Sequence, residues 1–203
     1  QMQSSAIFPL FYLPPVSYFS ALKNHNFQFE IEKHEHFVKQ TYRSRISIAS
    51  PDGILDLMIP VVKGAKFHTA MKDVKISYDF KWQRLHWLGL QTCYRSSAYF
   101  EYYEDGLAPF YEKKYEFLFD YNLELLNWVL KQLKQSPVNN FTQEFEQDIP
   151  TDLDFRNQFL KKDIHLAETK TYFQVFSDRN QFIPNLSIVD LLFNQGPQTK
   201  SYL

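Results

Sequence analysis

Cysteine and glycine are both scarce in this chain. The single cysteine, Cys93, cannot form an internal disulfide, so we expect a reducing compartment and a buried, unreactive thiol. Only 5 of the 203 residues are glycine, and the sequence contains no glycine-rich phosphate loop, no His-Glu-x-x-His motif and no Gly-x-Ser-x-Gly elbow. The sequence therefore disfavours the common nucleotide hydrolases, zinc proteases and serine hydrolases.

Long apolar runs and a large net charge are also lacking. No run approaches the roughly 18 residues of a membrane span. The apolar stretch Ile7–Val16 is broken by Pro9, Pro14 and Pro15 and has no basic leader. The formal net charge is −1, which argues against general nucleic-acid binding. We therefore expect a cytoplasmic protein with no membrane span, no nucleic-acid partner and a small-molecule substrate.

Positive charge is concentrated in the central part of the chain. Residues 33–95 hold 11 Lys or Arg and 5 Asp or Glu, whereas the rest of the chain holds 11 and 18. A basic segment in a nearly neutral protein fits a local anion site better than a nucleic-acid track. An ordinary fluctuation of charge on solvated faces is the alternative.

The order of the predicted elements indicates an α+β fold in a single domain, residues 1–203. Apolar residues make up 44% of the chain, enough for a sizeable core. The first elements read strand, helix, strand, which allows a parallel pair, and they span Ser5–Leu13, Val16–Asn24 and Phe27–Ile31.

An antiparallel hairpin is predicted next. The strands Phe37–Ala49 and Ile54–Val62 flank the turn signal Ser50-Pro-Asp-Gly53. We expect the hairpin and the N-terminal unit to share one mixed β-sheet with helices packed on it. The opening order of elements leaves an α/β nucleotide-binding architecture as the alternative.

The second half of the chain predicts mainly helices. Phe80–Tyr94 and Asn122–Lys134 show helical spacing and define a helical subregion at about 80–134. The aromatic side chains between them fit a packed core better than a sugar-binding floor. Thr171–Phe176 predicts a strand, and Ser187 predicts the N-cap of a last helix, Ile188–Phe193.

The sharpest candidate for an anion site is Lys39-Gln-Thr-Tyr-Arg-Ser-Arg45. On a strand, Lys39, Arg43 and Arg45 would point to one face and could clamp a phosphate or carboxylate. The alternative is a solvent-facing strand whose cations protect an edge. The nearby His34-Glu35-His36 has no further ligands at a familiar spacing, so we expect no metal site there.

Other candidate residues lie on the middle helix and near the C-terminus. His86 could act as a general base near neutral pH, or it could be a core histidine whose hydrogen bonds are satisfied. Trp82 and Tyr94 would line the same pocket. Gln174 and Asn185 precede the last helix, whose first backbone amides could bind an anion, although plain capping explains Ser187 and Asp190.

Several of these segments resemble the WbqC-like family of bacterial proteins. They are Pro9-Leu-Phe-Tyr-Leu-Pro14 with Tyr18-Phe19, the Lys39–Arg45 stretch with Gly53, the helix with Trp82 and His86-Trp87, and the ending Ser187-Ile-Val-Asp-Leu-Leu-Phe-Asn-Gln-Gly196. The resemblance covers about residues 5–196 and implies that the whole chain is one WbqC-like domain.

The resemblance implies a setting in bacterial surface-polysaccharide (O-antigen-type) biosynthesis. It suggests a transferase that moves an acyl or aminoacyl group to an amino sugar, with a nucleotide-linked sugar as substrate. His86 would be catalytic; Arg43, Arg45 and Asn185 would bind substrate. A non-catalytic binding or scaffold protein of a polysaccharide assembly complex is the alternative, and the sequence points to no particular cofactor.

Overall fold

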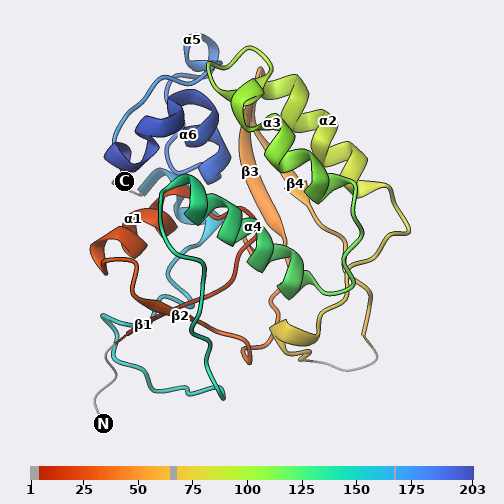
Figure 1. Cartoon of the computed structure of the whole chain (residues 1–203), viewed down its shortest axis with the longest axis vertical. Coiled ribbons are helices and arrows are strands. Elements are labelled where there is room, and N and C mark those ends of the chain that lie inside the picture. Colours follow the sequence, from red (N-terminus) through yellow and green to blue (C-terminus); the bar gives the residue numbers. More distant parts are fainter. Residues whose placement is uncertain (1–4, 65–67, 167) are drawn as a thin grey trace.

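The computed structural model describes residues 5–64, 68–166 and 168–203. Within them, helices and short strands form an α+β fold, as predicted. The strands make two separate two-stranded sheets, which corrects the expectation of one shared sheet. Figure 1 shows one pair, β1 and β2, near the N-terminus and the other, β3 and β4, beside the helices. Besides β1 and β2, parallel pairing in the described residues is limited to the isolated bridges Ile7–Asp154 and Ile31–Phe141, so the α/β nucleotide-binding alternative lacks its extended parallel sheet.

The N-terminal unit is the strand-helix-strand arrangement that the sequence predicts. Strand β1 (Ala6–Phe8) pairs in parallel with β2 (Phe29–Ile31), and helix α1 (Val16–Asn24) connects them. Helix α1 has the predicted bounds because Pro15 fixes an extended backbone immediately before its first turn. Strand β1 is shorter than predicted, since residues 9–14 leave the sheet.

The predicted hairpin is present but begins later than expected. Strand β3 (Arg45–Ser50) pairs antiparallel with β4 (Gly53–Met58) across a two-residue turn, and Gly53 has a φ of 113° that suits glycine. Residues 39–44 form turns instead of a strand, since Gln40 has a φ of 58° and the Thr41 hydroxyl donates to the Val38 carbonyl. Lys39 and Arg43 therefore do not share a strand face with Arg45.

Three helices pack together, and one of them lies against the hairpin. They are α2 (Trp82–Tyr94), which contacts the hairpin, α3 (Phe100–Leu107) and α4 (Leu118–Gln132). Most aromatic side chains between Tyr94 and Tyr121 are buried or half-buried, and Tyr102 is the one that is largely exposed. This confirms the packed-core interpretation of the aromatic segment. No helix in the described residues has the length and apolar character needed to cross a bilayer.

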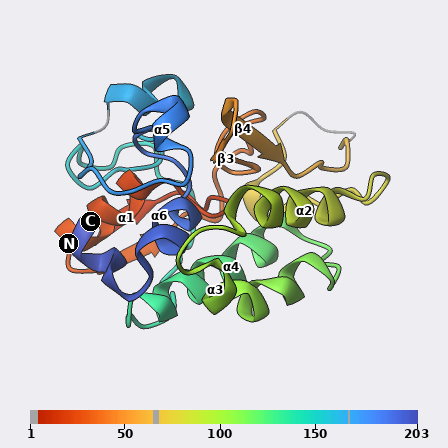
Figure 2. The same cartoon turned by 90° about the horizontal axis from the view of Figure 1, so that it is seen from above.

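The C-terminal part is a long irregular segment followed by a capped helix. The segment contains a 3-10 helix, Lys161–Leu166, and the single turn α5 (Ser177–Asn180), and the strand predicted at Thr171–Phe176 is absent. Helix α6 (Ile188–Gln195) starts at the predicted cap, where the Ser187 side chain accepts a hydrogen bond from the Val189 amide. Figure 2 shows this C-terminal part beside β3 and β4.

Candidate functional site

The three cations predicted to form one clamp are separated in the structure. Arg43 is buried, and its guanidinium holds Glu35 through two bonds, Nε to Oε2 at 3.0 Å and Nη2 to Oε1 at 2.7 Å. The same Nη2 also donates to the Arg156 carbonyl at 2.9 Å. Because the Glu35 carboxylate already accepts both hydrogen bonds from this edge of the guanidinium, Arg43 stabilises the turn before β3 and does not offer that edge to another anion.

A second buried arginine extends this network. Arg156 donates to Glu32 Oε1 at 2.9 Å and to both oxygens of Asp154 at 2.8 and 2.9 Å. The Thr142 hydroxyl donates to the other oxygen of Glu32 at 2.6 Å. Burial raises the pKa of Glu35, and Arg43 opposes this shift. The two arginines thus tie the segment after β2 to the C-terminal part of the chain.

The His86 side chain extends from α2 into the core and reaches the end of β4. Its Nδ1 is 2.9 Å from the Tyr12 hydroxyl, and its Nε2 is 2.9 Å from the Met58 carbonyl. The carbonyl can only accept, so Nε2 carries the proton and Nδ1 accepts from Tyr12. Burial lowers the pKa of His86 to about 4, so the ring is neutral at pH 7. Both ring nitrogens already have hydrogen-bond partners, and the Trp82 ring packs edge-on, with 5.0 Å between the two ring centroids. This geometry fits a structural role for His86.

Tyr94 and Gln174 converge on a different residue, Asp190. This carboxylate is fully buried and accepts from the Tyr94 hydroxyl at 2.7 Å, the Tyr172 hydroxyl at 2.6 Å and Gln174 Nε2 at 2.9 Å. Burial raises the pKa of Asp190, and the three donors oppose this shift. The cluster holds the irregular segment 170–187 against α2 and α6.

Asn185 caps helix α1, although the two are far apart in the sequence. Its Oδ1 accepts from the Ser17 amide in the first turn of α1 at 2.7 Å, and its backbone has a φ of 58°. The Ser187 hydroxyl donates to the Leu13 carbonyl nearby. The side chain of Asn185 therefore joins the C-terminal loop to the N-terminal unit.

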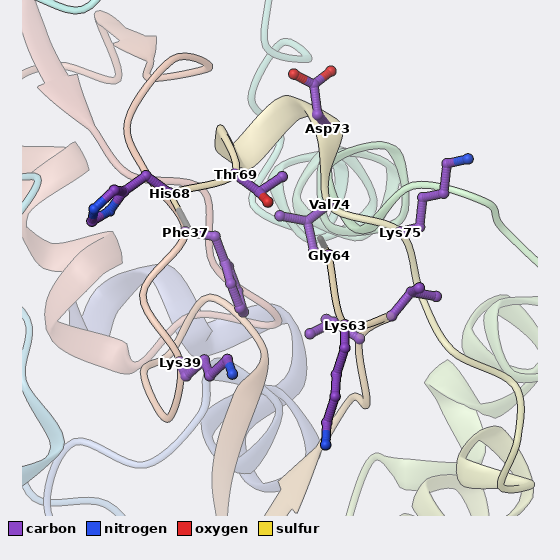
Figure 3. A pocket seen from close by; sticks show the side chains of 11 residues that line it. Phe37, Lys39, Lys63, Gly64, His68, Thr69, Asp73, Val74 and Lys75 are labelled. Atoms are coloured by element: carbon purple, nitrogen blue, oxygen red, sulfur yellow. The ribbon is translucent and has the colours of Figure 1, made fainter. Parts of the chain in front are cut away.

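Lys39 lies on a groove that sequence reasoning did not identify. The groove has a volume of about 530 Å³ and lies between the turn before β3, residues 61–64 after β4, and residues 68–75. Phe37 and Lys39 line one side, and Lys63 and Val74 line the other (Figure 3). Its walls are apolar, because Phe37, Val61, Val62 and Val74 contribute their side chains.

The charges around the groove are predominantly positive. Within the described residues, no carboxylate forms an ion pair with Lys39 or Lys63. Lys75 lies 3.5 Å from Glu116, and Asp73 is paired with a lysine outside the groove. The Asp73 carboxylate points away from Lys39 and Lys63 (Figure 3). The groove therefore suits a ligand with an anionic group and an apolar or ring-shaped part.

Arg45 occupies a third place, on the outer face of the hairpin. Its Nε is buried without a hydrogen-bond partner, and so is the hydroxyl of Tyr42. In the described part of the chain, no cluster of three or more His, Cys, Asp or Glu residues is arranged to hold a metal ion. The excess of positive charge in residues 33–95 was the sequence signal for both the groove and the position of Arg45, since Lys39, Arg45 and Lys63 all lie within this segment.

Comparison with known proteins places the chain in a family. The curated protein "Uncharacterized protein Rv1507c" of Mycobacterium tuberculosis (strain ATCC 25618 / H37Rv) is 25% identical over 228 residues, covering 100% of this chain and 98% of that protein. No solved structure matches the chain. The WbqC-like protein family matches residues 11–152 and 147–202, nearly the whole sequence. The chain therefore belongs to the WbqC-like protein family.

Proposed function

We propose that the protein binds an anionic small molecule of the nucleotide-linked sugar class in the groove beside Lys39 and Lys63. The proposal depends on one observation. The ammonium groups of Lys39 and Lys63 have no carboxylate partner among the described residues, and they lie beside an apolar wall. A diphosphate would meet the ammonium groups, and the base or sugar would pack on Phe37 and the valines. A volume of about 530 Å³ suits a ligand of this size.

The reaction we propose is transfer of an acyl or aminoacyl group to an amino sugar during assembly of a bacterial surface polysaccharide. The resemblance of the chain to WbqC-like proteins supports this setting, and the groove supports the class of substrate. His86 takes no proton in this proposal, because both of its ring nitrogens are already hydrogen-bonded. Its hydrogen bond to Met58 instead fixes the end of β4, from which the chain continues to Val61 and Val62.

The alternative function, a non-catalytic scaffold, receives less support from the surface. Such a protein would expose a large aromatic patch from the 94–121 segment. Of the aromatic side chains in that segment, only Tyr102 is largely exposed, at 69%. The described residues of this segment therefore offer no broad aromatic surface to a partner protein.

Calorimetric titration with a UDP-linked N-acetylhexosamine tests the proposal. We expect binding that weakens as salt is added, because the ammonium groups are exposed. Lys39→Ala and Lys63→Ala should each weaken it about tenfold, since a hydrogen bond to a charged group contributes about 1.5 kcal/mol. Lys131→Ala is the matched control, because Lys131 is an exposed lysine on α4 that does not line the groove.

The same titration distinguishes binding of a nucleotide-linked sugar from the scaffold function. Unmodified N-acetylhexosamine should bind far more weakly than the nucleotide-linked form, because it lacks the diphosphate. If UDP-, dTDP- and CMP-linked sugars all fail to bind at millimolar concentration, the proposal is wrong and the scaffold function is favoured. Equal loss of binding in Lys131→Ala would also contradict it, since the groove would then have no special role.

A further inference from the structure

Two buried polar groups where the chain enters the hairpin, one on Tyr42 in the preceding turn and one on Arg45 at the start of β3, have no hydrogen-bond partner within the described residues. The Tyr42 hydroxyl and Arg45 Nε are both sealed from solvent, and Tyr42 as a whole is 3% exposed. Neither side chain forms any other hydrogen bond or ion pair in that part of the chain. Native proteins rarely leave buried donors unsatisfied, because each costs the free energy of its desolvation. Two such donors, three positions apart in the sequence, require an explanation.

The charges near this pair favour an anion. Burial raises the pKa of Tyr42 to about 12; the charge of Arg45 opposes this shift and that of Asp56 adds to it. The hydroxyl therefore stays protonated at neutral pH and can donate. Register places Asp56 opposite Ser47, on the same face as Arg45.

Asp56 does not compensate Arg45, because other groups already satisfy its carboxylate. The Ser47 hydroxyl donates to its Oδ1 at 2.7 Å, and Lys161 forms an ion pair with its Oδ2. The charges of Asp56 and Lys161 cancel, and the positive charge of Arg45 remains. A hydroxyl donor, a guanidinium donor and one uncompensated positive charge together match a carboxylate or a phosphate.

We propose that Tyr42 and Arg45 form a second anion-binding site, which takes a carboxylate or phosphate group and which Lys161 completes by neutralising Asp56. The site lies on the hairpin face toward the C-terminal part of the chain. Neither residue lines the groove beside Lys39, so the proposal does not depend on the proposed function.

The C-terminal segment passes beside the site. The Phe159 ring lies 6.1 Å from that of Phe11, whose ring lies 5.7 Å from Tyr42, and Lys161 reaches Asp56 two residues later. Residues 159–161 therefore extend from the Phe11 ring to Asp56 on β4, and an anion bound at Tyr42 and Arg45 would meet this segment. We expect anion binding to be accompanied by movement of residues 159–161.

The test uses inorganic phosphate and acetate as probes, with sodium chloride at equal ionic strength as the reference. Titrations are made in a Lys39→Gln/Lys63→Gln background, which removes anion binding at the groove. We expect at least one probe to bind, and the difference between the two separates a phosphate site from a carboxylate site. Tyr42→Phe and Arg45→Gln should each weaken binding about tenfold or more.

A stability measurement distinguishes a binding role from a structural one. Tyr42→Phe removes an unsatisfied buried donor, so the ligand-free melting temperature should rise while anion binding falls. Tyr102→Phe, at an exposed tyrosine on α3, is the matched control and should change neither. Should Arg45→Gln fail to fold, Lys161→Ala keeps the test valid, because it leaves Asp56 uncompensated and should also weaken anion binding.

Two results would overturn the proposal. One is that neither phosphate nor acetate binds in the background variant. The other is that Tyr42→Phe lowers the ligand-free melting temperature and leaves the affinity for both probes unchanged. In either case the two donors serve the folded structure alone.

Discussion

Lowering the pH from 7.5 to 4.5 should destabilise the protein through His86. The imidazole is 3% exposed and is neutral in the folded state, where burial lowers its pKa from 6.5 to about 4. In the unfolded chain the ring takes up a proton as the pH falls through 6.5. The unfolded state therefore binds more protons between these two values, and stability falls with pH in that window.

The size of the effect follows from the two pKa values. The contribution of His86 is complete above pH 6.5 and is lost as the pH falls toward 4. At about 1.4 kcal/mol per pH unit, the loss between pH 7.5 and pH 4.5 is about 2.5 kcal/mol. A single domain of ordinary stability has about 5–15 kcal/mol in total, so the loss is readily measured.

Urea unfolding of the wild type and of His86→Gln, followed by far-ultraviolet circular dichroism, isolates this contribution. A glutamine amide can donate to the Met58 carbonyl and accept from Tyr12, but it does not titrate. The carboxylates of the chain titrate in both proteins and cancel in the comparison. The stability advantage of the wild type should therefore shrink by about 2.5 kcal/mol as the pH falls from 7.5 to 4.5.

A difference that is independent of pH over this range would refute the reasoning, because His86 would then have an ordinary pKa in the folded state. A change centred near pH 6.5 that stabilises the wild type would show that the ring is protonated in the core. Either result would reopen the interpretation of His86 as a general base.

Three substitutions test the buried contacts by urea unfolding. Arg43→Ala should cost about 3 kcal/mol or more, because it leaves the Glu35 carboxylate buried without its partner; a loss below about 1 kcal/mol would mean that water reaches that carboxylate. Gly196→Ala should cost about 1–2 kcal/mol, since the φ of 53° disfavours a side chain and the added Cβ would lie 2.5 Å from the Tyr99 ring; unchanged stability would contradict this. Asp190→Asn should cost about 2 kcal/mol, because an amide cannot accept from all three donors, and a neutral result would mean that the donors find other partners.

The parts of the fold that depend on local signals could be predicted from the sequence. Helix α1 follows Pro15 and has the predicted bounds, and α6 begins after Ser187 as its capping residue requires. The two-residue hairpin turn before Gly53 is confirmed for the same reason. In each case the residues that determine the element lie within a few positions of it.

The first part of the strand predicted at Phe37–Ala49 is wrong, because tertiary contacts hold residues 39–44 in turns; residues 45–49 lie in β3 as predicted. The sequence predicted one long strand, but Arg43 is held in the interior by its ion pair with Glu35, and the left-handed backbone at Gln40 breaks the extended conformation. The strand predicted at Thr171–Phe176 fails similarly, since Gln174 hydrogen-bonds Ile183 and Asp190 through its side chain. Neither the Arg43–Glu35 ion pair nor the side-chain hydrogen bonds of Gln174 leave a periodic pattern in the sequence.

The candidate site could be predicted only as a tendency. The excess of Lys and Arg in residues 33–95 indicated an anion site somewhere in that segment. The groove itself requires Lys39, Lys63 and Val74 to meet from three separate segments, which no spacing rule reveals. His86 looked like a base because the sequence cannot show that Tyr12 and Met58 occupy its two nitrogens.

The central claim, that the groove binds a nucleotide-linked sugar, is tested most directly by methyl NMR of valine-labelled protein. The reporters Val61, Val62 and Val74 line the groove, whereas Val129 and Val189 are fully buried on other elements and do not line it. On titration with a UDP-linked N-acetylhexosamine, the three groove signals should shift together with one binding constant while the other two stay in place. Unchanged groove signals, or shifts spread equally over all five, would contradict the account.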